Sequence, residues 1–497
     1  MAEVAFLAVD FGASSGRHVV GLYDGEHLWL EEVYRFENGP VEMAGSLFWD
    51  LPRLWTELRQ GLRAAAARFG SQIQSIGVDT WGVDFALLGR GDVLLGNPHH
   101  YRDSRTNGVM EKAFAQVSRQ EIFHHTGLQF MQFNTLYQLL AMLWQRSPLL
   151  EVAERLLMMP DLFHWLLTGE KSNEFTDVTT SQCYNPLRGD WAWELLERFG
   201  LPRQIFGPIT QPGTVLGRLR AAVAAETGLN HVRVILPGTH DTASAVMAVP
   251  AASQPGQQPD WCYISLGTWA LMGVEVPQPV VDDRVLRFNF TNEGGVGGTY
   301  RLLKNITGLW LVQECRRIWN QRGRNWSWDD LNELTASAPG LRAFIDPDSP
   351  EFLAPEDMPA AIWAYCQKTG QPVPADEGSV LRCALESVAM KARWVFRMCE
   401  ELVGRRIETI HIVGGGVQNR LLCQWIADAC ARPVLAGPVE ATATGNLMMQ
   451  AVASGHVGSI AQARQIIRES FPIEEYEPQN TPAWDEAFGR FEKLVGQ

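Results

Sequence analysis

A pattern of strand, glycine-containing polar loop and strand occurs twice in this chain and constrains its fold more than any other feature. FLAVDFGASSGRHVVGLYDG, near the N-terminus, predicts buried strands over residues 6–9 and 18–23. WCYISLGTWALMGVEV, residues 261–276, repeats the pattern. In each half a helical segment then leads to an apolar strand with a glycine-containing end, at residues 73–82 and 407–416. The repetition predicts an α/β fold of two duplicated domains with a cleft between them.

The chain is also long enough to need more than one hydrophobic core. Its 497 residues exceed what a single core normally supports. The segment 250–260, PAASQPGQQPD, has the composition of a linker or exposed loop. We therefore predict an N-terminal domain over residues 1–250 and a C-terminal domain over residues 251–497, with a helical tail whose last helix spans residues 484–495. The alternative is an α/β protein without duplication, in which strands merely precede glycines.

The composition is that of an ordinary soluble protein. The formal net charge of −14 argues against nucleic acid or an anionic membrane as the main partner. The chain shows neither a secretory signal nor an apolar run of the ~18 residues that a membrane span needs, so a cytoplasmic location is expected. The eight cysteines form no CxxC pair, and reduced thiols are expected. A disulfide between Cys366 and Cys383 is the alternative. The sequence does not indicate an oligomeric state.

Three glycine-containing loops are candidates for binding a phosphate or a nucleotide. Neither a GxxxxGK[ST] motif nor a GxGxxG motif after a strand occurs. The first loop combines backbone N–H groups, hydroxyl groups and a guanidinium, and Asp10 would tolerate a phosphate that carries Mg²⁺. SLGTW, residues 265–269, permits close backbone approach, and IVGGGVQN, residues 412–419, offers a flat floor for a base or ribose. A tight turn without ligand is the alternative for the first loop and for the triple-glycine loop.

Two polar segments are candidates for the substrate site. In LPGTHDTASAV, Asp241 stands at the start of a small-residue helix, as a helix N-cap or as a general base for a substrate hydroxyl. In GVDTWGVDFALL, Trp81 and Asp84 suggest a surface for a polyol, which offers C–H faces and hydroxyl groups. A core tryptophan with solvent-facing aspartates is the alternative for the second segment.

Taken in order, these segments resemble the FGGY carbohydrate kinases. The likeness extends from about residue 4 to about residue 455 and is carried by DFGASSGR, DTWGVDFALL, YRDSRTNG, GTHDTASAV, SLGTWALMG, FTNEGG, LLKNITGLWLVQE and HIVGGGVQN. The resemblance implies two duplicated actin-like ATPase domains, of the ribonuclease-H-like fold, around a central cleft. It also implies a kinase that uses ATP and Mg²⁺.

The resemblance implies a role for each matching position. It makes Asp241 the general base. It implies contacts with the sugar at Gly82, His240, Asp241, Thr242 and Asn305. It implies ATP binding at Ala13, Ser14, Ser15, Gly16, Arg17, Thr268, Gln313, Gly414, Gly415 and Gly416. It implies that Asp10 holds Mg²⁺ through water. The roles of Asn305 and Gln313 rest on the resemblance alone.

The expected reaction transfers the γ-phosphoryl group of MgATP to a primary hydroxyl of a ketose. L-Rhamnulose, phosphorylated at O1, is the first expectation, and L-fuculose or xylulose is the alternative within the family. A non-catalytic actin-like protein that binds nucleotide is the alternative outside it. The expected partners are therefore a ketose and ATP, without nucleic acid or membrane.

Overall fold

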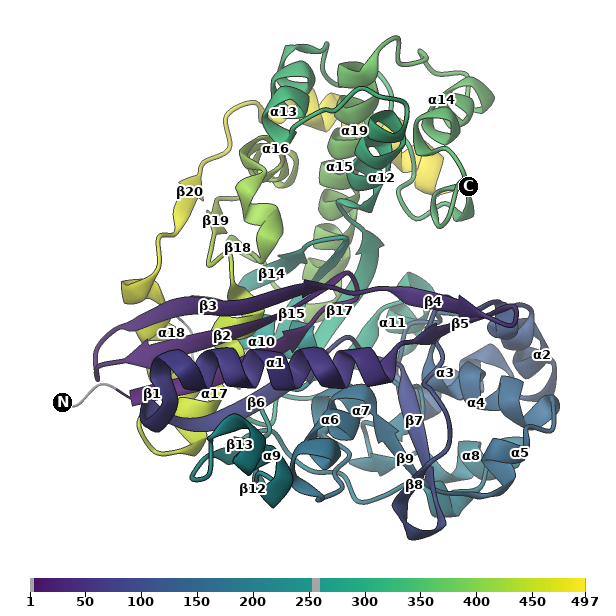
Figure 1. Ribbon diagram of the computed structural model, residues 1–497. Helices are drawn as coiled ribbons and strands as arrows, with labels where there is room; N and C mark the ends of the chain where they lie inside the picture. The colour runs from purple at the N-terminus through teal and green to yellow at the C-terminus, as the bar shows by residue number, and fades with distance from the viewer. Residues whose placement is uncertain (1–3, 253–259, 497) are drawn as a thin grey trace. The chain divides into compact units, whose positions relative to one another are not determined.

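The computed structural model describes residues 4–252 and 260–496 (Figure 1). The described chain divides into two compact units, one of residues 4–252, 275–302 and 441–471 and the other of residues 260–274, 303–440 and 472–496. Most of the segment 250–260, which we predicted to be a linker, lies outside the described residues. Among the described helices, none combines the length and the apolar character needed to cross a bilayer.

The first unit is built on a mixed sheet with the strand order β12-β13-β6-β1-β2-β3. Its strands are β1 (Val4–Phe11), β2 (Ser15–Tyr23), β3 (Leu28–Glu37), β6 (Ile73–Thr80), β12 (Val215–Arg218) and β13 (Arg233–Ile235). β1 and β2 form the predicted antiparallel hairpin, and β1 runs parallel to β6. Because the hairpin ladder continues to Phe11 opposite Gly16, the loop contains only residues 12–14. Ser15 and Arg17, expected in the loop, are therefore residues of β2.

Helices and short strands make up the rest of the first unit. The helices are α1 (Leu51–Phe69), α2 (Val109–Gln116), α3 (Arg119–Thr126), α4 (Thr135–Trp144), α5 (Pro148–Glu151), α6 (Met159–Thr168), α7 (Phe175–Val178), α8 (Trp193–Phe199), α9 (Ala221–Thr227), α10 (Asp241–Met247), α11 (Asp283–Phe288), α17 (Ala441–Ala453) and α18 (Ile460–Ser470). The short strands are β4 (Pro40–Met43), β5 (Ser46–Trp49), β7 (Phe85–Gly89), β8 (Val93–Leu94), β9 (Ala153–Met158), β10 (Tyr184–Asn185), β11 (Asp190–Trp191) and β16 (Thr291–Gly294). Since α17 and α18 come from near the C-terminus, the first unit needs both ends of the chain.

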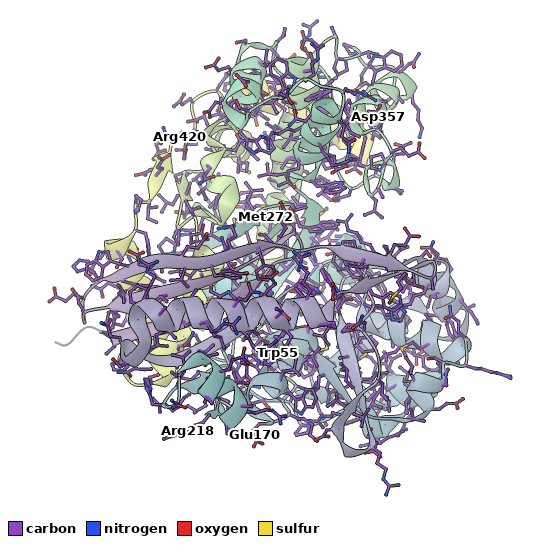
Figure 2. All side chains as sticks on the ribbon, viewed as in Figure 1. Trp55, Glu170, Arg218, Met272, Asp357 and Arg420 are labelled. Atoms are coloured by element: carbon purple, nitrogen blue, oxygen red, sulfur yellow. The ribbon has the colours of Figure 1, made fainter. Side chains whose placement is uncertain are left out.

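Helix α1 covers one face of the first sheet because its apolar residues recur every three or four positions (Figure 1). The side chain of Asp50 caps its N-terminus by accepting a hydrogen bond from the N–H of Arg53. The buried side of α1 packs with alternate residues of β1 in one apolar cluster, and Trp55 is half-buried against it (Figure 2). The other residues of β1, which include Asp10, point to the opposite face.

Helix α17 packs on the face of the sheet that α1 leaves open. Its Gln450 accepts a hydrogen bond from the hydroxyl of Ser75 on β6 and donates one to the carbonyl of Leu7 on β1. The same helix packs tightly against α10, since a Cβ atom at Gly445 would lie 1.8 Å from the carbonyl oxygen of Ser244. The two helices can approach this closely only with glycine at position 445.

The second unit repeats the strand pairing of the first. β14 (Trp261–Leu266) and β15 (Trp269–Val276) form an antiparallel hairpin, and β14 runs parallel to β18 (Thr409–Val413). The predicted recurrence of the hairpin and of the later strand is confirmed. The other elements are β17 (Tyr300–Thr307), β19 (Val434–Ala436), β20 (Glu474–Tyr476), α12 (Trp310–Gln321), α13 (Trp328–Ser337), α14 (Met358–Lys368), α15 (Glu377–Val403), α16 (Arg420–Cys430) and α19 (Thr481–Val495). The end of β15, residues 275–276, and the start of β17, residues 300–302, belong to the first unit. The last helix begins earlier than predicted, because Pro482 suits its first turn.

Candidate functional site

Acidic residues gather at one edge of the sheet of the first unit. Asp10 and Asp79 are direct partners in the parallel pair of β1 and β6. The N–H of Thr80 donates to the carbonyl of Thr239 at 2.9 Å, which brings the start of α10 to the same edge. Asp10 and Asp241 both raise the pKa of the buried Asp79 by charge repulsion, after the larger effect of burial. Three carboxyl groups thus converge where ligands commonly bind in sheets with parallel strands.

Asp241 is the first residue of α10, and the N-cap of this helix is His240. The N-cap alternative for Asp241 is therefore wrong. Its side chain is 31% exposed, and its Oδ1 accepts a hydrogen bond of 3.1 Å from the hydroxyl of Thr242. Burial raises the pKa of Asp241, His240 lowers it and Asp10 raises it further. A carboxylate with a raised pKa and access to solvent is suited to accept a proton from a hydroxyl group.

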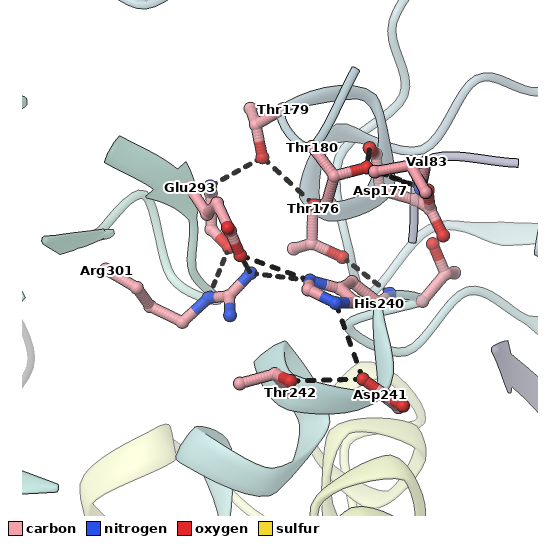
Figure 3. A network of polar contacts seen from close by, with 12 residues as sticks. Val83, Thr176, Asp177, Thr179, Thr180, His240, Asp241, Thr242, Glu293 and Arg301 are labelled. Atoms are coloured by element: carbon pink, nitrogen blue, oxygen red, sulfur yellow. Dashed lines mark hydrogen bonds and ion pairs between the residues drawn. The ribbon is translucent and has the colours of Figure 1, made fainter. Parts of the chain in front are cut away.

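His240 lies between Asp241 and a buried ion pair (Figure 3). Its Nε2 is 3.4 Å from Asp241 Oδ1. Its Nδ1 is 3.1 Å from Arg301 Nη2 and 3.3 Å from Glu293 Oε2. Neither residue of the pair was predicted from the sequence. Glu293 stands in the FTNEGG segment without an assigned role, and the only signal at Arg301 was a charged residue within a mainly apolar strand.

Gly82 lies in the turn after β6 and packs against Thr180. A Cβ atom at position 82 would lie 2.9 Å from Cγ2 of Thr180. The N–H of Val83 donates to the hydroxyl of the same threonine at 2.9 Å, so the turn is held in place. This packing is a structural reason for glycine, and the contact of Gly82 with the sugar stays a prediction.

Trp81 and Asp84 do not form the polyol surface that we predicted, because both are buried. Trp81 stacks on Trp49 with ring centroids 3.7 Å apart. Both indole N–H groups donate to Asp84 Oδ2, and Gln138 donates to Oδ1 at 2.9 Å. Burial raises the pKa of Asp84 to about 6. The alternative of a core tryptophan is confirmed, but Asp84 is not solvent-facing.

The loop between β1 and β2 is braced by its neighbours. The N–H of Gly12 donates to the carbonyl of Ser15 at 2.9 Å, and Asn38 Nδ2 donates to the carbonyl of Gly12 at 2.8 Å. Arg17, assigned to phosphate, forms an ion pair with Asp10 across the hairpin, with Nη2 at 2.7 Å from Oδ2. The two charged residues that we assigned to phosphate and metal are therefore direct neighbours.

The other loop residues assigned to ATP differ in exposure. Ser14 is exposed, Ala13 and Ser15 are half-buried, and Gly16 is buried. A Cβ atom at position 16 would lie 2.1 Å from Cζ of Phe36. Packing against this ring therefore requires the glycine, whereas residues 13–15 keep accessible surface for a ligand.

Two of the residues assigned to ATP in the second unit are in contact. Thr268, in the turn between β14 and β15, donates a hydrogen bond of 3.2 Å to Gln313 Oε1 on α12. The helix is held to this turn, because the N–H of Trp310 donates to the carbonyl of Thr268 at 3.1 Å.

A pocket of about 560 Å³ within this unit is lined by Gln313, Arg316, Arg317, Asn320, Gln321 and Trp328. Its amide and guanidinium groups are suited to a polar ligand.

The three glycines after β18 pack against the end of β14 to different degrees. Gly414 has a φ of 88°, in the region that favours glycine. A Cβ atom at Gly416 would lie 2.3 Å from Cγ of Leu266, whereas one at Gly415 would meet nothing within 4 Å. Gly415 is also exposed, so it is the glycine best placed to approach a ligand. Asn305, assigned to the sugar, is half-buried on β17.

Neither a metal cluster nor a disulfide appears in the part of the chain that the structure describes. Among residues 4–252 and 260–496, no group of three or more His, Cys, Asp or Glu side chains is arranged to hold a metal ion. All eight cysteines are buried free thiols. Cys366 and Cys383 lie in contact, with Sγ atoms 4.0 Å apart, so the disulfide alternative is not realised in this structure.

Known proteins of one family are similar to the chain over most of its length. The N-terminal domain model of the FGGY family of carbohydrate kinases matches residues 5–248, and the C-terminal domain model matches residues 262–454. The rhamnulokinase of Bacteroides thetaiotaomicron is 44% identical over 490 residues, which are 99% of each chain. The rhamnulokinase of Halalkalibacterium halodurans is 42% identical over 470 residues, 95% of this chain and 98% of the relative.

Solved structures of sugar kinases share the fold. A ligand-bound xylulose kinase from Lactobacillus acidophilus has a TM-score of 0.81 at 15% identity and covers 99% of this chain and 98% of its own. Plasmodium falciparum glycerol kinase with ADP has a TM-score of 0.76 at 13% identity, over 99% of this chain and 97% of its own. The predicted α/β fold with two actin-like, ribonuclease-H-like domains is confirmed. The two domain models together span most of the chain, and it belongs to the FGGY family of carbohydrate kinases.

Proposed function

We propose that this chain transfers the γ-phosphoryl group of ATP to the O1 hydroxyl of L-rhamnulose, forming L-rhamnulose 1-phosphate and ADP. The observation that carries the proposal is the position of Asp241. It is the first residue of α10, at the edge of the first sheet, and its carboxylate is partly exposed. This carboxylate can take the proton of an attacking sugar hydroxyl late in phosphoryl transfer. The identity of the sugar is inferred from the curated relatives, which are rhamnulokinases.

We assign the binding of the sugar and the binding of ATP to two sets of residues. Sugar contacts are assigned to Gly82, His240, Thr242 and Asn305. ATP contacts are assigned to Ala13, Ser14, Ser15, Gly16, Arg17, Thr268, Gln313, Gly414, Gly415 and Gly416. The accessible surface of residues 13–15 and the contact between Thr268 and Gln313 support this assignment.

The domain boundary near residue 250 and the cytoplasmic location stay predictions from the sequence.

The carboxyl groups at the edge of the first sheet fit Mg²⁺. This ion prefers oxygen ligands and usually keeps several waters while it binds one or two carboxylates and the substrate phosphates. Asp10 would hold it through water, and Asp79 Oδ1, buried without a hydrogen-bond partner, is a second oxygen at this edge. When bound, the ion neutralises charge on the phosphates. Arg17, beside Asp10, would orient phosphate oxygens with its guanidinium.

The proposed sugar is tested by measuring ADP release over a panel of ketoses. We expect the highest kcat/KM with L-rhamnulose and lower values with L-fuculose and xylulose, because a mismatched hydroxyl leaves polar groups of the site unpaired. Product NMR should place the phosphate on O1. A preference for another ketose would replace the sugar and keep the kinase. No ADP release with any ketose, despite ATP binding, would instead favour the non-catalytic alternative.

The assignment of Gln313 to ATP predicts a change in one Michaelis constant only. We expect Gln313→Ala to raise the KM for ATP by about 5- to 10-fold, the equivalent of one lost hydrogen bond, and to leave the KM for the ketose nearly unchanged. Gln367→Ala is the matched control, since Gln367 is an exposed glutamine on α14 of the same unit. An unchanged KM for ATP in the Gln313 variant would remove this residue from the site.

A further inference from the structure

Glu293 and Arg301 form a buried ion pair beside His240 that the family resemblance leaves without a role. Arg301 is fully buried and Glu293 is 5% exposed. Arg301 Nη2 lies 3.2 Å from Glu293 Oε2, and its Nε donates to the carbonyl of Gly294 at 2.9 Å. A buried ion pair is weak support for stability, because desolvation of the charges offsets their attraction. Its position against the ring of His240 points to a different role.

The guanidinium of Arg301 contacts Nδ1 of His240, while Nε2 of the same ring faces Asp241. A guanidinium nitrogen donates hydrogen bonds and cannot accept them. The contact of 3.1 Å between Arg301 Nη2 and His240 Nδ1 has hydrogen-bond geometry and therefore uses a lone pair on Nδ1. Glu293 Oε2 lies 3.3 Å from the same nitrogen but makes no hydrogen bond within the described residues. In a neutral imidazole the proton then lies on Nε2, which is 3.4 Å from Asp241 Oδ1. The side of the ring that faces Asp241 is thus a donor.

We propose that Arg301, held by Glu293, is a positioning residue that fixes the Nε2–H tautomer of His240, through which His240 orients the Asp241 carboxylate. The proposal rests on the proposed role of Asp241 as general base. Without the guanidinium, His240 Nδ1 would donate to Glu293 Oε2, now 3.3 Å away. Nε2 of the neutral ring would then turn a lone pair toward Asp241, which repels the carboxylate.

Two threonines of the segment around α7 hold the backbone on both sides of these contacts (Figure 3). The N–H of His240 donates to the hydroxyl of Thr176 at 3.1 Å. The hydroxyl of Thr179 accepts a hydrogen bond of 2.6 Å from the N–H of Gly294, next to Glu293. The segment around α7 therefore holds both the backbone of His240 and the strand that carries Glu293.

The tautomer can be read from the ¹⁵N chemical shifts of the full-length protein labelled at histidine. The signals of His240 are assigned as those that disappear from the spectrum of the His240→Gln variant. We expect an unprotonated Nδ1 and a protonated Nε2 in the wild type, and a protonated Nδ1 in Arg301→Met. Arg301→Lys keeps a donor and should keep the wild-type tautomer. A protonated Nδ1 in the wild type would overturn the proposal even if the Arg301→Met variant did not fold.

A second buried pair of the same unit provides the matched control. Arg464 is fully buried and lies 2.9 Å from Glu275, which is 5% exposed. Arg464→Met therefore removes the same kind of ion pair at the C-terminal end of α10, where Arg464 donates to the carbonyls of Val246 and Met247, and not at His240, the N-cap of this helix. It should leave the tautomer of His240 unchanged. A tautomer that changes equally in both variants would mean that Arg301 acts only through general stability, against the proposal.

Kinetics test whether the tautomer matters for turnover. His240→Gln places an amide near the position of Nε2, whereas His240→Asn places one near that of Nδ1. We expect kcat of the Gln variant to exceed that of the Asn variant by about 10-fold, and Arg301→Met to lower kcat by about 10- to 100-fold with little change in the KM for ATP. Equal kcat values in the two His240 variants would contradict the proposal. Wild-type turnover in Asp241→Asn would instead refute the proposed base, without affecting the NMR result.

Discussion

Replacing Asp241 by asparagine is expected to lower kcat with a ketose by about 100-fold or more, while the affinity for ATP stays nearly unchanged. Asparagine has nearly the shape of aspartate but cannot accept the proton of the attacking hydroxyl. The side chain stands at the first position of α10 with Thr242 as its hydrogen-bond donor, so the substitution leaves the helix in place. Initial rates, together with calorimetric titration of ATP, measure the two effects separately.

Asp283→Asn is the control for this substitution. Asp283 is likewise the first residue of a short helix of the first unit, α11, but its side chain is 80% exposed. We expect wild-type turnover in this variant, since it makes the same chemical change away from the sheet edge. If Asp241→Asn kept kcat within about 10-fold of the wild type, general base catalysis would have to come from another group.

Replacing Gly445 by alanine is expected to have the largest effect on stability. The added Cβ atom would lie 1.8 Å from the carbonyl oxygen of Ser244, and a backbone atom inside a packed helix pair cannot move aside alone. Helices α10 and α17 must separate, which we expect to lower the free energy of unfolding by about 3 kcal/mol. Urea denaturation followed by circular dichroism measures this change. Because α10 carries Asp241, kcat should fall in the same variant.

Gly489→Ala is the matched control, because it makes the same change in another helix. Gly489 lies on α19, is exposed, and a Cβ atom there would meet nothing within 4 Å. We expect this variant to be more stable than the wild type by about 0.5 to 1 kcal/mol, the helix propensity difference between the two residues. Equal stability of the two alanine variants would contradict the close packing of α10 on α17.

The elements that were predicted correctly depend on interactions between neighbours in the sequence. Apolar strands that flank a short polar loop specified the hairpins of β1 with β2 and of β14 with β15, because such pairing needs only a turn. The boundaries were less accurate. The ladder between Asp10 and Arg17 extends the first hairpin into the expected loop, since opposite charges that face each other favour continued pairing.

The candidate site shows where local patterns are insufficient. Asp241 and the first loop stood out as polar residues between apolar segments, and the triple glycine stood out as a stretch without side chains. Trp81 and Asp84 stood out in the same way, but both are buried. The carboxylate of Asp84 can be buried because Trp49 and Gln138, which lie in distant parts of the sequence, donate hydrogen bonds to it. The sequence around a carboxylate that lies among apolar residues is the same whether the carboxylate accepts hydrogen bonds from water or from buried side chains.

Periodicity and turn residues were thus enough to predict the duplicated α/β organisation and to single out Asp241 as the proposed base, since those features depend on short stretches of chain. The surroundings of that base were established by folding. Arg301 and Glu293 reach His240 from another part of the chain, and α17 reaches α10 across almost 200 residues. Such contacts depend on how strands and helices assemble, and a single chain read residue by residue contains no signal for which distant side chains will meet.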